Sequence, residues 1–90
     1  MSTTARRVRV QGRVQGVFFR DSCRQEAERH GVAGWVVNAP DGTVEIELEG
    51  APDAVQAVVD WANRGPASAE VRSVAVYELL ETGERTFTVR

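Results

Sequence analysis

Lysine is absent from this sequence of 90 residues, and cysteine, methionine and tyrosine occur once each. Because Cys23 is alone, a domain stapled by internal disulfides is excluded, and a reducing compartment such as the cytoplasm is expected. No apolar run approaches the roughly 20 residues that a membrane-spanning helix needs, so we expect no membrane partner. The segment Met1 to Ala5 is polar and lacks the apolar core of a signal peptide. We expect residues 1–5 to be disordered.

The remaining composition is that of one globular domain, which we place at residues 6–90. Hydrophobic residues make up 42% and charged residues 27% of the chain, which excludes a wholly disordered protein. The formal net charge of -2 is the opposite of what nucleic-acid binding favours. All positive side chains are Arg, whose planar guanidinium suits phosphate, but biased codon usage explains most of them. Only an Arg in a special position is therefore informative.

Alternation of apolar and polar residues predicts strands that bury one face. Val8, Val10 and Val14 alternate with arginines near the N-terminus. Val44 to Leu48 forms the clearest strand, because apolar residues alternate there with Glu45, Glu47 and Glu49. Shorter apolar stretches predict three more strands, around Trp35–Asn38, Val74–Val76 and Phe87–Val89.

Two segments have the patterns of helices that pack on a sheet. The polar run from Arg20 to His30 carries Cys23 and Ala27 four residues apart, and both are small enough for close packing. Gly31 is a natural helix stop. Pro52 suits the first position of a second helix, whose apolar stripe consists of Val55, Val58, Val59 and Ala62.

The order of these elements is β-α-β-β-α-β with one added strand. This order predicts an α+β protein of the ferredoxin-like class: an antiparallel sheet, two helices on one face, and a short extra C-terminal strand. The class hosts many unrelated activities, so it does not identify the chemistry.

The first strand–helix junction, Gly12 to Arg20, reads GRVQGVFFR. Successive main-chain N–H groups in such a loop, at a helix N-terminus, form an anion site, and Arg20 adds a charge with bidentate geometry. On spacing alone, a tight turn with a solvated Arg explains the pattern equally well.

Topology connects this loop with Asn38, which closes the second strand. In a βαβ crossover the two strands run parallel, so their C-terminal ends share one edge of the sheet, about 10 Å apart if one strand lies between them. Arg20 and Asn38 can then converge on one phosphate. For Asn38 alone, turn formation before Pro40-Asp41-Gly42 is the commoner explanation.

Two long motifs resemble those of a known family. Gly12 to Arg20 resembles the first signature of the acylphosphatases, and Gly34 to Gly50, GWVVNAPDGTVEIELEG, resembles their second. Gly65-Pro66 also fits the family pattern, and the resemblance covers nearly the whole chain. One departure is Val37, where relatives usually carry a basic or polar residue.

The resemblance implies a hydrolase of acyl phosphates that needs no cofactor and no metal. In that family the Arg matching Arg20 binds the phosphoryl group, and the Asn matching Asn38 orients the attacking water. The main chain of the loop cradles the phosphate oxygens; its residues here are Gln15, Gly16, Val17, Phe18 and Phe19. We expect a monomer that acts on a small-molecule acyl phosphate.

Four other residues invite a functional reading that we do not favour. His30 would lie roughly 15 Å from Arg20 along one helix, which suits a charge at the helix end rather than a general base. Cys23 to Arg29 matches the C-x5-R signature of cysteine phosphatases, but the run between them favours a helix over a loop. Trp35 and Trp61 accompany apolar faces, so packing is expected.

Two alternatives remain at this point. An RNA-binding module of this architecture needs exposed aromatics on the central strands and a basic sheet face. Here the exposed positions carry Arg and Glu, and pairing of Arg7, Arg9 and Arg13 with the three glutamates explains them. The other alternative is a regulatory domain that binds an anion without turning it over.

Overall fold

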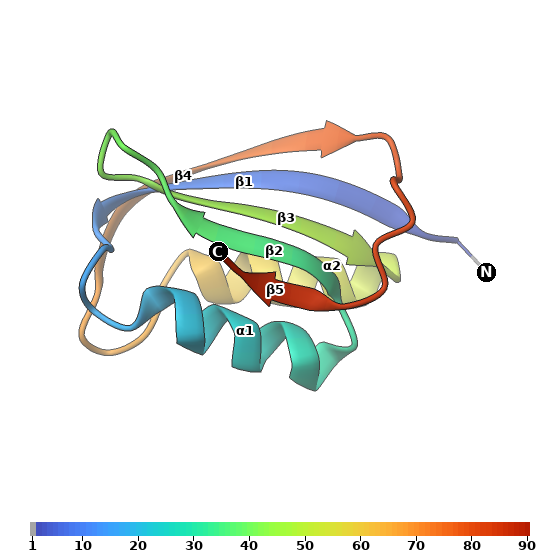
Figure 1. Cartoon of the computed structure of the whole chain (residues 1–90), viewed down its shortest axis with the longest axis horizontal. Helices are drawn as coiled ribbons and strands as arrows, with labels where there is room; N and C mark the ends of the chain where they lie inside the picture. Colours follow the sequence, from blue (N-terminus) through green and yellow to red (C-terminus); the bar gives the residue numbers. More distant parts are fainter. Residues whose placement is uncertain (1) are drawn as a thin grey trace.

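The computed structural model describes residues 2–90, and Met1, the first residue of the predicted disordered segment, lies outside them. Five strands and two helices follow the predicted order along the chain (Figure 1). Their bounds are β1 Thr4–Arg13, α1 Phe19–His30, β2 Ala33–Asn38, β3 Val44–Gly50, α2 Pro52–Ala62, β4 Glu70–Leu79 and β5 Phe87–Val89. The predicted α+β class is confirmed.

The strands form one sheet in the order β4-β1-β3-β2-β5. The first four are antiparallel to their neighbours, as predicted, and β3 lies between β1 and β2. The added strand β5 runs parallel to β2, so the sheet is mixed rather than wholly antiparallel. The order of the elements along the chain does not specify which strand β5 pairs with. The sequence order alone therefore could not predict the direction of β5.

The first strand begins earlier than the sequence suggested. Thr4 and Ala5, expected in a disordered segment, belong to β1 and pair with Gly50 and Glu49 of β3. Ala5 is buried although its neighbours in the sequence are polar. The disorder predicted for residues 1–5 is therefore wrong for these two residues.

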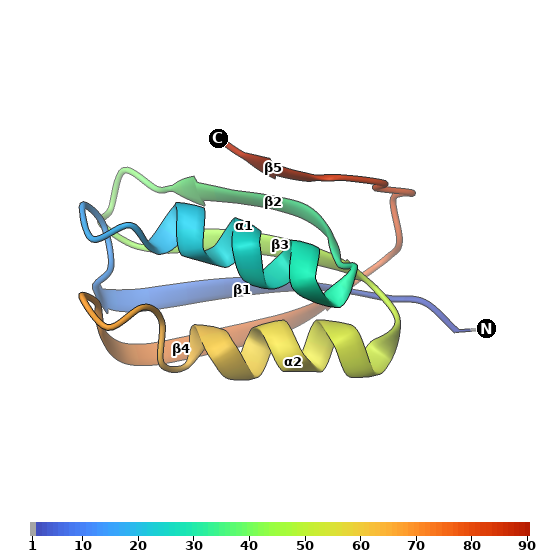
Figure 2. The same ribbon diagram turned by 90° about the horizontal axis from the view of Figure 1, so that it is seen from below.

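Both helices cover the same face of the sheet (Figure 2). α1 packs on β2 and β5, and α2 packs on β1 and β3. Pro52 opens α2, where its missing N–H is no loss, and Gly31 ends α1 in the left-handed conformation with φ 69°. Cys23 and Ala27 are fully buried, which confirms the predicted close approach of α1 to the sheet.

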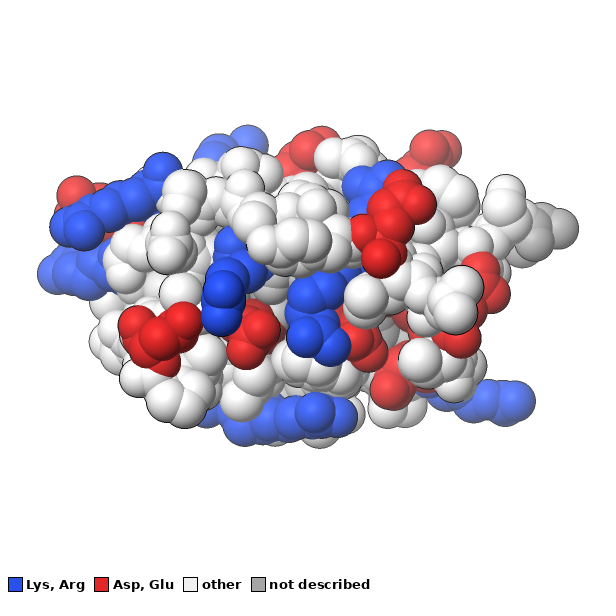
Figure 3. All heavy atoms as spheres, turned by 90° about the horizontal axis from the view of Figure 1, so that it is seen from above, with Lys and Arg blue, Asp and Glu red and all other residues white. Residues whose placement is uncertain are grey.

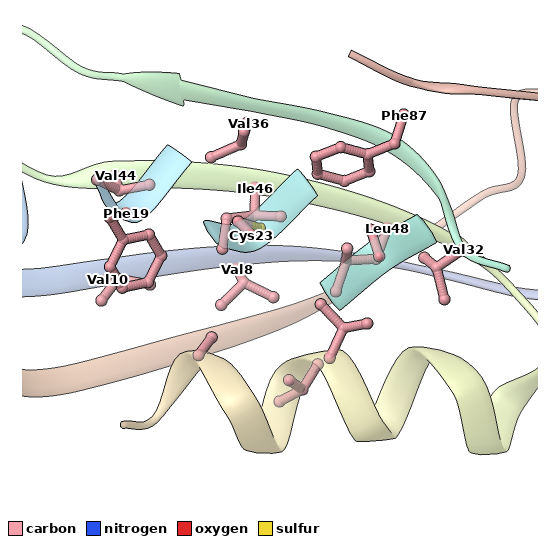
Figure 4. Close-up of a cluster of buried hydrophobic side chains, with 14 of the residues drawn as sticks. Val8, Val10, Phe19, Cys23, Val32, Val36, Val44, Ile46, Leu48 and Phe87 are labelled. Carbon is pink, nitrogen blue, oxygen red and sulfur yellow. The ribbon is translucent and has the colours of Figure 1, made fainter. Parts of the chain in front are cut away.

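The core lies between these helices and the sheet (Figure 4). Most of its strand residues are predicted apolar strand positions, and both predicted helix stripes belong to it; Phe19 and Val32 join it without having been predicted. The largest fully buried side chains include Phe19, Ile46, Leu48, Val8, Val10 and Val36. Phe19 is the first residue of α1, so the core reaches directly to the loop in which the sequence predicts an anion site.

Candidate active site

The loop between β1 and α1 has the backbone geometry of an anion cradle. Gly16 (φ 74°) and Phe18 (φ 64°) are left-handed, and Phe18 is the N-cap of α1. Left-handed residues in a loop turn successive N–H groups toward one side. In the described chain, the N–H groups of residues 16–19 donate to no main-chain acceptor. These donors, at a helix N-terminus, are therefore available to an oxyanion.

Two side chains brace this loop from opposite sides. The amide of Gln15 donates to the carbonyls of Ala39 (2.8 Å) and Thr43 (2.9 Å), which belong to the β2–β3 turn. From the α2–β4 connection, the Ser68 hydroxyl donates to the carbonyl of Val17 at 2.7 Å. The sequence placed Gln15 in the loop for its main chain only, and it did not single out Ser68, because both contacts bridge distant segments.

Phe19 anchors the end of the loop in the core. Its side chain is 1% exposed and meets Trp61 with ring centroids 5.1 Å apart, which confirms the packing expected for Trp61. Gly65 lies against the same ring with φ 68°, and a Cβ there would come within 2.8 Å of Phe19 Cε2. The Gly65-Pro66 turn is therefore needed for the loop to sit where it does.

A cavity of about 340 Å³ opens beside the loop. Its lining brings together Arg20 and Asn38 with three of the five predicted cradle residues, Gly16, Phe18 and Phe19. The other two are not part of the lining, since the Gln15 side chain reaches the β2–β3 turn and Val17 packs against the core. The sequence did not predict the remaining lining residues, Val14, Asp21 and Val89.

Arg20 is held by the chain after β5. Its Nη1 donates to the main-chain carbonyl of Arg90 at 2.8 Å, the one hydrogen bond of this guanidinium within residues 2–90. The other N–H donors of the fork are free for an anion. No local pattern indicates this contact with Arg90, because it joins residues 70 apart.

Asn38 closes β2 on the same face of the sheet as Val36, the face that α1 covers. Its Oδ1 is buried and accepts no hydrogen bond from any residue that the structure describes. Buried acceptors almost always have a donor, so this carboxamide requires one from a molecule in the cavity. Val37, the departure from the family pattern, does not line this cavity.

A carboxylate also lines the cavity. Arg24 donates to Asp21 at 3.0 Å and holds its pKa below the usual range, with a further hydrogen bond from Gln25. Asp21 therefore stays ionised, but its charge is balanced by Arg24 one turn along α1. Arg20 and the helix N-terminus therefore supply the net positive potential in the cavity.

The residues that the sequence analysis set aside lie in helical positions. Cys23 and Arg29 both belong to α1, so no phosphate loop joins them. Burial raises the pKa of the Cys23 thiol, which keeps it neutral and poorly nucleophilic. His30 ends α1, ten residues from Arg20, and faces Glu26 at 3.6 Å.

The helix-free face of the sheet carries both charges (Figure 3). Arg7 pairs with Glu47 at 3.0 Å and approaches Glu45 at 4.0 Å, as predicted. The rest of the predicted pairing is wrong, because nearer partners compete: Arg9 pairs with Asp41, and Glu49 accepts hydrogen bonds from residues 82 and 83. Likewise, Arg13 donates to the carbonyl of Ser68.

Trp35 lies on this open face between two guanidiniums. Arg7 is 5.1 Å and Arg90 4.6 Å from its ring. A ring that already contacts two cations, among Arg–carboxylate pairs, is a poor platform for RNA bases. The central strands β1 and β3 carry Arg and Glu on this face, without aromatic residues.

The described part of the chain holds no group of three His, Cys, Asp or Glu residues that could bind a metal. No helix among residues 2–90 has the length and apolar character required to cross a membrane. Together, fold and cavity define a ferredoxin-like α+β protein whose first strand–helix loop has main-chain N–H donors that no described main-chain acceptor uses.

Comparison with known proteins specifies the class. The acylphosphatase family model matches residues 6–89. An acylphosphatase of Rubrobacter xylanophilus is 55% identical over 93% of this chain and 77% of its own, and one of Gloeobacter violaceus is 53% identical over 90% and 89%. The acylphosphatase structure from Coxiella burnetii superposes with a TM-score of 0.94 at 39% identity, covering 98% of this chain and 93% of that one. The Bacillus subtilis structure gives 0.92 at 38%, covering 97% and 98%.

The chain belongs to the acylphosphatase family. It hydrolyses the carboxyl–phosphate bond of acyl phosphates to a carboxylate and inorganic phosphate.

Proposed function

We propose that this hydrolysis takes place in the cavity beside the β1–α1 loop, with Arg20 as phosphate anchor and Asn38 as water-orienting residue. The observation that carries the proposal is that both side chains line one cavity with the free N–H groups of the loop. The main chain of residues 15–19 acts as the cradle. Gln15 and Val17 do not line the cavity, and the Gln15 side chain braces the loop against the β2–β3 turn.

The reaction requires little covalent chemistry from the protein. A carboxylate is a stable leaving group, so the acyl oxygen needs little protonation, and the remaining tasks are charge neutralisation and alignment. Arg20 and the loop amides neutralise the non-bridging phosphoryl oxygens. The buried Oδ1 of Asn38 accepts a hydrogen bond from water and holds it in line for attack on phosphorus.

The test is steady-state hydrolysis of benzoyl phosphate by Arg20→Ala and Asn38→Ala. Loss of one preorganised donor costs on the order of 10²–10³ in rate, and Arg20→Ala should lie at or beyond the upper end because it removes charge and position together. Arg29→Ala and Asn63→Ala remove the same side chains elsewhere and should keep the wild-type rate. Near-wild-type rates in folded Arg20→Ala and Asn38→Ala proteins would overturn the assignment.

Three further expectations join this proposal: the protein is a monomer, it lies in the cytoplasm, and it needs no metal. The free, buried Cys23 fits a reducing compartment. Gel filtration across a concentration series tests the oligomeric state, cell fractionation tests the compartment, and an assay with a chelator tests the metal. The anion-binding alternative predicts phosphate affinity without turnover, which the benzoyl phosphate assay separates directly.

A further inference from the structure

Phe18 is an aromatic residue left in solvent at the mouth of the cavity. It is 80% exposed and is absent from the core cluster. Its φ of 64° is costly for any residue with a Cβ, and in the described chain no other non-glycine residue has a positive φ. Glycine or asparagine would tolerate the left-handed backbone better and would leave no aromatic ring in solvent. Fold stability therefore does not explain a phenylalanine at this position.

A second apolar side chain meets the same cavity from another element. Val89 of β5 is 38% exposed and lines the cavity with Phe18. The polar side chains of the lining are Arg20, Asp21 and Asn38, so the cavity presents both polar and apolar groups. An acyl phosphate likewise combines a charged phosphoryl group with an acyl group that can be apolar.

We propose that Phe18 and Val89 form an acyl subsite that favours apolar acyl phosphates, with aromatic acyl groups preferred. This inference rests on the proposed function, which places the phosphoryl group on Arg20 and the loop amides. With that end fixed, the acyl group extends toward the ring of Phe18. Ring-to-ring contact of this kind changes an equilibrium or rate by about threefold to tenfold.

The experiment compares benzoyl phosphate with acetyl phosphate in Phe18→Asn, Phe18→Trp and wild type. Asparagine tolerates the left-handed backbone while removing the ring, and tryptophan keeps an aromatic face. For Phe18→Asn, kcat/KM should fall about threefold to tenfold with benzoyl phosphate and less than twofold with acetyl phosphate. Phe18→Trp should retain the preference. Dividing each variant by wild type cancels the different reactivities of the two anhydrides.

Leu80→Ala is the matched control, because Leu80 is 90% exposed and does not line the cavity. It should leave both substrates unchanged. If Phe18→Asn lowers both substrates equally, the ring only supports the loop and the subsite proposal is overturned, while the roles of Arg20 and Asn38 stand. Failure of those roles would show separately, as a near-wild-type rate of benzoyl phosphate hydrolysis by the Arg20→Ala variant.

A binding measurement keeps the proposal testable without turnover. Benzylphosphonate and methylphosphonate are non-hydrolysable competitors that differ only in the ring. Phe18→Asn should raise the inhibition constant of benzylphosphonate by the same factor and leave that of methylphosphonate unchanged. If Phe18→Asn does not fold, Val89→Ala takes its place with the same two inhibitors, and equal weakening of both would reject the subsite.

Discussion

The two walls of the cavity are built differently. The loop wall, residues 14–20, is tied to the core by Phe19 and braced by Gln15 and Ser68 from two separate connections. The β5 wall consists of Val89, which lines the cavity, and the following residue Arg90, which holds Arg20. It belongs to a strand of only three residues and its end, after an exposed stretch, residues 80–86. The comparison indicates that several contacts from distant segments hold the loop wall, while the partner that holds Arg20 depends on a few local contacts.

The largest expected effect is on the loop wall. Phe19→Ala removes a fully buried ring at the head of α1, so the free energy of unfolding should fall by about 3–5 kcal/mol. Urea titration followed by circular dichroism measures this. Phe18→Ala, the neighbouring exposed ring, is the matched control and should change stability much less. A small loss for Phe19→Ala would remove the argument that the core holds the loop.

Gln15→Ala should have the next largest effect. It removes one of the two donors to each of the carbonyls of Ala39 and Thr43, which keep their main-chain donors, and frees the loop from the β2–β3 turn. Two hydrogen bonds of about 0.5–1.5 kcal/mol each suggest a loss of about 1–3 kcal/mol, and kcat should fall with it because the amides lose alignment. Gln25→Ala, on the exposed face of α1, serves as the control. An unchanged kcat would mean that the brace is not needed for catalysis.

The segment that leads into the β5 wall should become less stable at acid pH. Glu49 accepts hydrogen bonds from the main chain of Thr82 and Gly83, and the Thr82 N–H is the chief reason that the pKa of this carboxyl lies below its usual range. A depressed folded-state pKa means that the stabilisation is complete above the ordinary value, about 4.3, and is lost as pH falls through the folded value.

Glu49→Gln should remove this acid dependence. Amide exchange at Thr82 and Gly83 should quicken in wild type as pH falls below about 4.3, once the intrinsic pH dependence of exchange is corrected. In Glu49→Gln it should be fast throughout. Glu47→Gln, whose carboxyl pairs with Arg7 instead, is the control. Identical profiles in wild type and Glu49→Gln would show that this carboxylate does not anchor the wall.

The smallest expected effect concerns Asp21. Arg24→Ala removes the donor that lowers the pKa of Asp21 and leaves its carboxylate unbalanced beside the cavity. KM for an acyl phosphate should rise about twofold to threefold with kcat unchanged, since exposed ion pairs contribute little. Asp21→Asn in the same background should restore KM. A fall in kcat instead would indicate a structural role for the pair.

The sequence predicted the loop wall better than the β5 wall, for physical reasons. Alternating valines, two helix stripes and the βαβ crossover are local patterns, and they were enough to bring Arg20 and Asn38 to one cavity. The contact of Arg20 with Arg90, the Ser68 brace and the direction of β5 depend on pairings between segments 50 to 70 residues apart. No local periodicity of the sequence encodes such pairings. The predicted pairing of Glu49 with an arginine was wrong for the same reason.

Each wall contacts one of the two tryptophans. Trp61 touches Phe19 of the loop wall, and Trp35 lies against Arg90 of the β5 wall. Replacing either by Phe leaves a single tryptophan, which reports on the wall that it contacts. The emission of the Trp61→Phe protein then follows the contact that holds Arg20, and that of Trp35→Phe follows the cradle. Ligand-induced changes in the two halves can be timed separately, with no label attached.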